Sequence, residues 1–288
     1  MTSLREVLKR AEADKIAVGH FNFSDLVAFN AIVAAARDRK LPVMVGVSEG
    51  EREFTGVLQA AALVKAIRDE YDYPIFLNAD HTHSIAKAEA AAKAGFDEII
   101  FDGSALPFEE NIAQTIKAIE AIKSINPAIL VEGEIGWIGS SSAVMDKVPK
   151  GVGVLTTPEE AKHFVDATKV DVLAPAVGNM HGMLESMVHG DVEKRLNIER
   201  IAEIKAACGI FMTLHGGSGT SDANFTAAAK AGMTIIHVSS ELRLAWRRGV
   251  EQALKDPNEI APYKLVAPAV TEIQKIVVDR LKLFNGLS

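Results

Sequence analysis

Apolar and polar positions along the chain form two kinds of segment that alternate. Short runs that are apolar almost without interruption are typical of strands buried on both faces of a parallel sheet. Eight such runs cover residues 16–22, 42–48, 74–81, 98–102, 128–134, 171–177, 210–215 and 234–239. Each run ends in a polar residue or is followed directly by glycine, which indicates that the strand stops there.

The segments between these runs have the amphipathic or alanine-rich pattern of helices. They cover residues 2–15, 24–40, 56–71, 85–94, 107–124, 198–207, 221–231, 241–254 and 270–284, and Thr157-Pro158 begins a further helix. Strands and helices in regular succession predict an α/β fold, a (β/α)8 TIM barrel. We expect a single domain, residues 1–288, with an N-terminal helix and a C-terminal helical extension. An open doubly wound sheet with an appendage is the alternative, and the regular spacing favours the barrel.

Charge and composition exclude several classes of partner. The net charge of -7 argues against a nucleic-acid-binding face, which needs a basic patch. No apolar run reaches the roughly 20 residues that a membrane span needs. The single cysteine, Cys208, excludes an internal disulfide and fits a reducing compartment. We therefore expect a cytoplasmic protein that does not bind nucleic acid or membranes.

Histidine side chains lie at the ends of three predicted strands. His81 follows Asp80 at the end of the third strand, His181 follows the sixth, and His215 ends the seventh. Because the carboxyl ends of barrel strands meet at one rim, these side chains are expected to converge. Three imidazoles with one open position are the ligand set of a catalytic zinc. A single histidine at a strand end is more often structural, but this set of three predicts a metal site. Asp102, Glu134 and His237 are expected at the same rim.

Two loops at the same rim have the composition of a phosphate site. The run His-Gly-Gly-Ser-Gly at 215–219 precedes a helix, and Ser239-Ser240 precedes the next one. Backbone N–H groups, hydroxyls and the positive ends of helices bind phosphate. A tight turn explains either loop alone, but adjacent loops after strands seven and eight favour phosphate. A metal beside phosphate suits the aldol cleavage of a phosphorylated ketose, with a carboxylate that moves a proton.

With these motifs, the sequence resembles the class II (zinc-dependent) fructose-bisphosphate and tagatose-bisphosphate aldolase family over essentially its whole length. The resemblance is carried by residues 21–22, 80–81, 101–104, 131–136, 177–182, 215–219 and 238–242. Each motif alone is weak, and together they are specific.

The resemblance assigns roles to individual residues. It implies that His81, His181 and His215 hold zinc, and that Asp80 takes the C4 hydroxyl proton in cleavage and returns it in condensation. Asp102 and Glu134 are expected beside the ligands or as candidate bases. The remaining residues are expected to contact the substrate and its phosphate group: Asn22, Ser48, Gly182, Gly216, Ser218, His237, Ser239 and Ser240.

The chain departs from the family pattern at four places. Asn78 replaces the first histidine of His-x-Asp-His, and Ser142 replaces the loop glutamate that handles the C–H proton. Glu185 replaces a lysine, and residues 235–237 replace Lys-x-Asn. We expect protonated His237 to supply the missing charge near phosphate. The candidates to replace the loop base are Glu134, Asp146 and His83.

We therefore expect a lyase of glycolysis and gluconeogenesis that cleaves fructose 1,6-bisphosphate to dihydroxyacetone phosphate and glyceraldehyde 3-phosphate. The alternatives are an aldolase for tagatose 1,6-bisphosphate or another ketose phosphate, and a catalytically weak paralogue that binds sugar phosphate. The resemblance implies Zn2+ as cofactor and leaves a monovalent cation open as a second one. It also suggests a homodimer or homotetramer.

Overall fold

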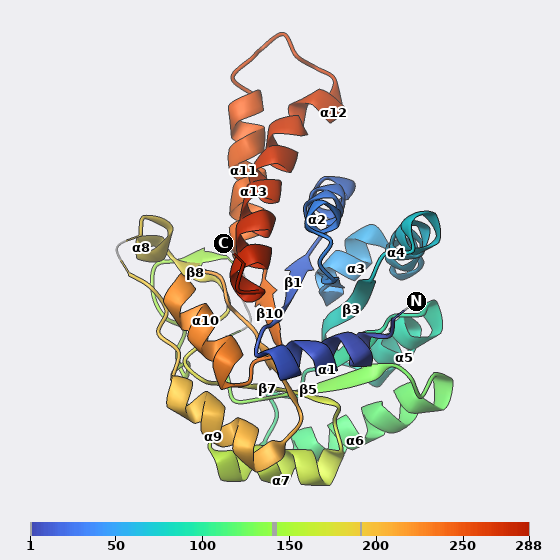
Figure 1. Cartoon of the computed structure of the whole chain (residues 1–288), viewed down its shortest axis with the longest axis vertical. Coiled ribbons are helices and arrows are strands. Elements are labelled where there is room, and N and C mark those ends of the chain that lie inside the picture. Colours follow the sequence, from blue (N-terminus) through green and yellow to red (C-terminus); the bar gives the residue numbers. More distant parts are fainter. Residues whose placement is uncertain (1, 140–142, 191, 288) are drawn as a thin grey trace.

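In the computed structural model, which describes residues 2–139, 143–190 and 192–287, parallel strands close into one barrel (Figure 1). The strand order around the barrel is β1-β10-β9-β7-β5-β4-β3-β2. The barrel strands are β1 (Val18–Asn22), β2 (Val43–Val47), β3 (Ile75–Thr82), β4 (Glu98–Phe101), β5 (Leu130–Ile135), β7 (Val172–Pro175), β9 (Phe211–Leu214) and β10 (Ile235–Val238). The predicted (β/α)8 architecture is therefore confirmed.

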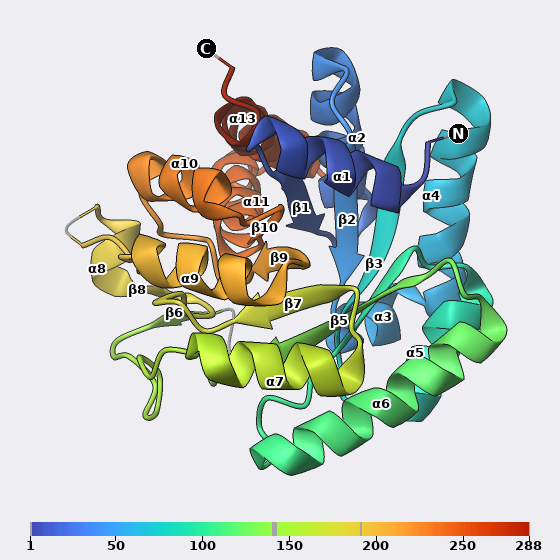
Figure 2. The ribbon, with the colours of Figure 1, turned by 60° about the horizontal axis from the view of Figure 1, so that its bottom comes forward.

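Helices surround the barrel and bury its outer face (Figure 2). The helices in the described part of the chain are α1 (Leu4–Asp14), α2 (Leu26–Arg39), α3 (Glu49–Thr55), α4 (Val57–Tyr71), α5 (Ile85–Ala94), α6 (Phe108–Ile125), α7 (Pro158–Thr168), α8 (Glu185–Val188), α9 (Ile198–Cys208), α10 (Asp222–Ala231), α11 (Ser240–Ala253), α12 (Pro262–Leu265) and α13 (Ala267–Phe284), and α1, α8 and α12 lie outside this surrounding layer. None of the helices in this described part of the chain has the length and apolarity needed to cross a lipid bilayer.

The pattern of apolar residues did not predict every element. Helix α3 begins directly after β2, because Ser48 and Glu51 form a capping box that satisfies the first amides of the helix. The strands β6 (Val144–Met145) and β8 (Met183–Leu184) form a small parallel sheet outside the barrel. Both strands are too short to show a periodicity in the sequence.

Helix α1 closes the amino end of the barrel. In Figure 1 it crosses in front of the strands, and its apolar face packs against the first residues of several of them. Leu4, Val7 and Leu8 contact a cluster that includes Val18 of β1 and Phe76 of β3. With this end filled by apolar side chains, the opposite rim is the open end of the barrel.

Helices α11 and α13 form an antiparallel pair that projects away from the barrel, with α12 at its tip (Figure 1). The first turn of α11 lies at the barrel rim, directly after β10. The predicted C-terminal helical extension is present and begins slightly earlier than expected, at Ala267.

Replacing Leu8 by Ala is expected to lower the free energy of unfolding by about 2–5 kcal/mol, because it leaves a cavity under the barrel. Leu8 is 0% exposed and Leu58 is 70% exposed, so Leu58→Ala is the matched control. The control is expected to change stability by less than about 0.5 kcal/mol. Urea unfolding followed by circular dichroism measures both, and equal losses would show that α1 is not part of the core.

Candidate active site

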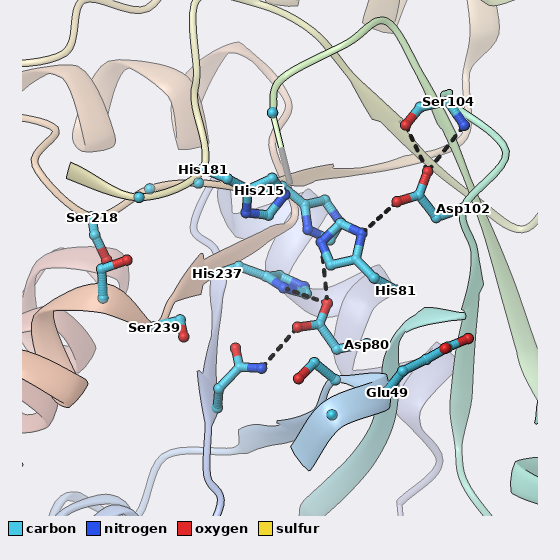
Figure 3. A pocket seen from close by; sticks show the side chains of 18 of the residues that line it. Glu49, Asp80, His81, Asp102, Ser104, His181, His215, Ser218, His237 and Ser239 are labelled. Atoms are coloured by element: carbon cyan, nitrogen blue, oxygen red, sulfur yellow. Dashed lines mark hydrogen bonds and ion pairs between the residues drawn. The ribbon is translucent and has the colours of Figure 1, made fainter. Parts of the chain in front are cut away.

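A β-bulge at the end of β3 turns two consecutive side chains toward the same place. The pairing of β3 with β4 passes from Ala79–Ile99 to Thr82–Phe101, so β3 contains one extra residue. Consecutive residues of a regular strand face opposite sides, whereas Asp80 and His81 both face the open end of the barrel (Figure 3). His81 has a positive φ of 39°, an uncommon conformation for a non-glycine residue.

Four side chains offer metal-ligand atoms within a small volume. His81, Glu134, His181 and His215 each provide one such atom, and these atoms lie within 4.8 Å of one another. The three imidazole rings come from separate segments that meet at the rim (Figure 3), and the Glu134 carboxylate comes from β5. In the described residues no hydrogen-bond partner reaches four buried atoms of this group: His81 Nε2, His181 Nε2, His215 Nδ1 and Glu134 Oε2. Buried polar atoms without partners are costly, so their convergence fits a metal ion.

Two of the imidazoles are held from behind by carboxylates. The distance from His81 Nδ1 to Asp102 Oδ2 is 2.9 Å, and that from His215 Nε2 to Glu132 Oε1 is 2.6 Å. An imidazole that donates from one nitrogen keeps a lone pair on the other. In the tautomers that donate to these carboxyl groups, His81 Nε2 and His215 Nδ1 are the nitrogens available to a metal. Burial raises the pKa of Glu132 to about 8, and a metal on His215 Nδ1 would favour the tautomer that donates to Glu132.

Burial and neighbouring charges affect the three histidines differently. Burial lowers the pKa of His181 well below its ordinary value, and the charge on His81 lowers it further. The same two causes lower the pKa of His215 to about 3, so both rings are neutral at neutral pH. Burial also lowers the pKa of His81, but nearby carboxylates, chiefly Asp80 and Asp102, outweigh it and raise this pKa well above its ordinary value. A metal must therefore displace a proton from His81.

Asp80 lies beside the metal-ligand group with one oxygen fixed and the other open. Its Oδ2 accepts a hydrogen bond of 2.7 Å from Asn22 Nδ2, and its Oδ1 is 3.6 Å from His81 Nε2. Burial raises the pKa of Asp80, but the neighbouring imidazoles, chiefly His81, and the amide of Asn22 outweigh it and lower this pKa below its ordinary value. Arg52 donates to the backbone carbonyl of Asp80 and to the Thr82 hydroxyl, which braces the bulge.

The expectation that His237 is protonated is wrong. His237 pairs with His20 across β10 and β1, and the two rings stack with centroids 3.4 Å apart. Burial lowers the pKa of His237 well below its ordinary value, and the charge of His20 lowers it further. His237 is therefore neutral, and its Nδ1 lies 3.7 Å from Asp80 Oδ1. His237 therefore lines the site as a polar ring, but it does not supply the positive charge of the lysine that the family has near this position.

The metal-ligand group lies at the edge of a pocket of about 380 Å³. Gly216 has a φ of +60°, and a Cβ there would be 2.4 Å from the Met180 carbonyl oxygen, so the two loops pack directly on each other. Ser239 precedes α11, and its Oγ finds no hydrogen-bond partner among the described residues. All the residues expected to contact substrate or phosphate line this pocket: Asn22, Ser48, Gly182, Gly216, Ser218, His237, Ser239 and Ser240.

The candidates for the missing loop base are placed differently. Glu134 is buried among the metal-ligand atoms, and its pKa is raised well above its ordinary value by burial and by Asp102. His83 lines the pocket, whereas Asp146 is exposed and is not among the lining residues. Ser142 lies outside the described residues. Asn78 lies in the barrel interior, where it joins His20 to Glu98.

Sequence reasoning missed three residues that shape the site. Glu132 could have been found, because it is two residues before Glu134 and therefore faces the same side of β5. Arg52 and Lys194 gave no signal, since each is one cation within a polar segment. Their positions depend entirely on how distant segments pack.

Comparison with known proteins identifies the family. A model of the family described as fructose-bisphosphate aldolase class-II matches residues 2–287. The chain belongs to this family of class II aldolases. A fructose-bisphosphate aldolase from Geobacillus stearothermophilus is 33% identical over 290 residues, which cover 99% of this chain and 97% of that protein. A probable fructose-bisphosphate aldolase from Bacillus subtilis is likewise 33% identical, with coverage of 99% and 98%.

Solved structures of similar fold include the YdjI aldolase from Escherichia coli K12. It has a TM-score of 0.82 and 26% identity, and the match covers 98% of this chain and 97% of that one. The predicted family, barrel and aldolase type of lyase activity are thus confirmed.

Replacing Glu132 by Gln is expected to weaken zinc binding by about 10- to 100-fold, because the carboxylate no longer orients and polarises His215. Competition with a chromophoric chelator measures this affinity. Glu98→Gln is the matched control, since Glu98 is equally buried but its carboxylate bonds to Asn78 instead of a ligand. Equal zinc affinity in the Glu132 variant and the wild type would exclude this supporting role.

Proposed function

We propose that this protein is a zinc-dependent aldolase that reversibly cleaves fructose 1,6-bisphosphate to dihydroxyacetone phosphate and glyceraldehyde 3-phosphate. The supporting observation is that three buried imidazole nitrogens converge without hydrogen-bond partners among the described residues. The Asp80 carboxylate lies 3.6 Å from one of these nitrogens, and two loops that contain serine and glycine line the same pocket. The names of the Geobacillus and Bacillus relatives point to the same substrate.

In this proposal Asp80 moves the proton of the C4 hydroxyl. The carboxylate is ionised, because its pKa is held low, and Oδ1 has no hydrogen-bond donor among the described residues. Asn22 fixes the orientation of the carboxylate through Oδ2 and is itself positioned by Glu51. A zinc ion held by His81, His181 and His215 would supply a Lewis acid for the ketone oxygen and for the charge that develops during C–C cleavage.

The dihydroxyacetone phosphate half would place its phosphate against the loops that follow β9 and β10. Helix α11 begins at Ser240, so its positive end faces this region, and the unpartnered Ser239 hydroxyl is available to donate. Gly216 permits close approach because the position holds no side chain. Phosphate bound here puts the ketone end of the substrate next to the metal ligands.

A ketose with a different phosphate pattern is the second candidate. Among the described residues that line the pocket, Arg243 alone bears a permanent positive charge, and it pairs with Glu51 at 2.6 Å. A substrate with two phosphates carries more negative charge than this lining offsets. This observation favours a ketose monophosphate, or an epimer such as tagatose bisphosphate, as the substrate to test beside fructose bisphosphate.

A panel of fructose and tagatose bisphosphates and monophosphates tests the proposal, with dihydroxyacetone phosphate release as the readout. We expect cleavage with zinc, its loss after chelation and its return when zinc is restored. Borohydride with substrate is expected to leave the enzyme active, because no lysine is among the described residues that line the pocket, and a Schiff base needs one. Cleavage that persists after complete metal removal would contradict the proposal.

Replacing Asp80 by Asn is expected to lower kcat by about 10²- to 10⁴-fold, since the proton acceptor is removed while the shape is kept. Zinc content is expected to be unchanged, because Asp80 is not among the three proposed ligands, which are His81, His181 and His215. Steady-state kinetics and metal analysis of the same preparation separate the two effects. A variant that retains wild-type kcat would assign the proton transfer to another residue.

A further inference from the structure

Lys194 is a buried cation that the proposed mechanism does not use. The residue is 4% exposed, and none of the described carboxylates forms an ion pair with its ammonium group. Its Nζ instead donates to three backbone carbonyl oxygens, those of Met180 at 2.6 Å, Gly182 at 2.6 Å and Gly216 at 2.9 Å. A lysine buried in this way needs a compensating role, because an isolated buried charge is costly.

The three carbonyls belong to two loops that form the site. Met180 and Gly182 flank the proposed ligand His181, and Gly216 follows the proposed ligand His215. Gly182 and Gly216 also line the substrate pocket. The ammonium group therefore joins the two loops directly beneath the expected position of the phosphate.

The cage of carbonyls favours the charged form of the lysine. Three acceptors require three N–H donors, which an ammonium group has and a neutral amine does not. Burial lowers the pKa of Lys194 to about 7, while the nearby Glu241 carboxylate raises it. A phosphate dianion in the pocket would stabilise the charge further.

The backbone of Lys194 is fixed to the phosphate loop as well. Its amide donates to the Gly219 carbonyl at 2.9 Å, and the residue forms an isolated parallel bridge with Thr220. The side chain therefore enters the cage from a fixed point, and no neighbouring residue has to move to place it there.

We infer that Lys194 acts as a built-in monovalent cation, which holds the two loops in their phosphate-binding arrangement and supplies positive charge from behind the pocket wall. Rings of backbone carbonyls bind alkali-metal cations in proteins, and here an ammonium group fills such a cage. The inference rests on the proposed function for the identity of the phosphate ligand. It makes Lys194 a positioning residue, since the side chain reaches the substrate only through the loops.

The test uses two variants of the zinc-loaded protein. Lys194→Met keeps the length of the side chain without its charge, and Lys194→Ala leaves room for a cation. Binding of dihydroxyacetone phosphate and of inorganic phosphate is measured by calorimetry, in tetramethylammonium, potassium or ammonium chloride at equal ionic strength of about 0.1 M. Lys65→Met is the matched control, because Lys65 is an exposed lysine in α4.

Both Lys194 variants are expected to bind dihydroxyacetone phosphate at least about 10-fold more weakly than the wild type, since charged hydrogen bonds across two loops are lost. Potassium or ammonium is expected to restore part of the affinity of Lys194→Ala, which a purely packing role would not allow. The wild type and Lys65→Met are expected to bind equally well in all three salts.

Three results would overturn the inference: wild-type affinity in both Lys194 variants, a loss that no small cation restores, or a wild-type protein whose affinity depends on potassium. If the variants fail to fold by circular dichroism, the salt comparison on the wild type decides alone. A wild type that binds dihydroxyacetone phosphate but cleaves no ketose phosphate would end the proposed function and leave this result intact.

Discussion

Hydrogen bonds between carboxylates and imidazoles organise the open end of the barrel. Asp102 holds His81 and Glu132 holds His215, and in each pair the nitrogen left over faces the same small volume. Without these carboxylates, each ring could turn its lone pair elsewhere, and the buried nitrogens would lose their common direction. The proposed metal site depends on this shared direction, and Asp80 lies beside it, with its Oδ1 3.6 Å from His81 Nε2.

The barrel interior beneath the site is unusually polar. His20, Asn78, Glu98 and Glu132 are each 0% exposed, and hydrogen bonds connect the first three of them across β1, β3 and β4. Burial raises the pKa of Glu98 well above its ordinary value, and the neighbouring Glu132 adds to this, so the group is kept neutral. The replacement of a histidine by Asn78 is thus part of a connected network, in which an amide both donates and accepts.

Few positively charged side chains lie near the proposed phosphate site. Arg243, the permanent cation among the described pocket-lining residues, is paired with Glu51. The departures at Glu185 and at residues 235–237 removed the lysines that the family resemblance led us to expect. Lys194 lies behind the pocket wall and donates to the carbonyl oxygens of Gly182 and Gly216. In our inference its positive charge compensates for these missing lysines.

The sequence by itself determined the barrel, and it placed at one rim the histidines proposed as metal ligands and the loops proposed to bind phosphate. Continuous apolar runs with polar ends are a local property, and the closure of parallel strands then brings His81, His181 and His215 to one rim. The motif in residues 215–219 and the serines at 239–240 are equally local, because their chemistry lies in backbone N–H groups and hydroxyls. The residues expected to contact substrate or phosphate all line one pocket, as this closure requires.

Only the tertiary structure decided the orientation and charge of the groups. The bulge that turns Asp80 and His81 the same way depends on pairing with β4 and on Arg52, which lies far from β3 in the sequence. Burial lowers the pKa of His237 and the neighbouring His20 lowers it further, and the cage around Lys194 comes from two separate loops. Burial and the field of distant neighbours set these properties, and no stretch of consecutive residues contains that information.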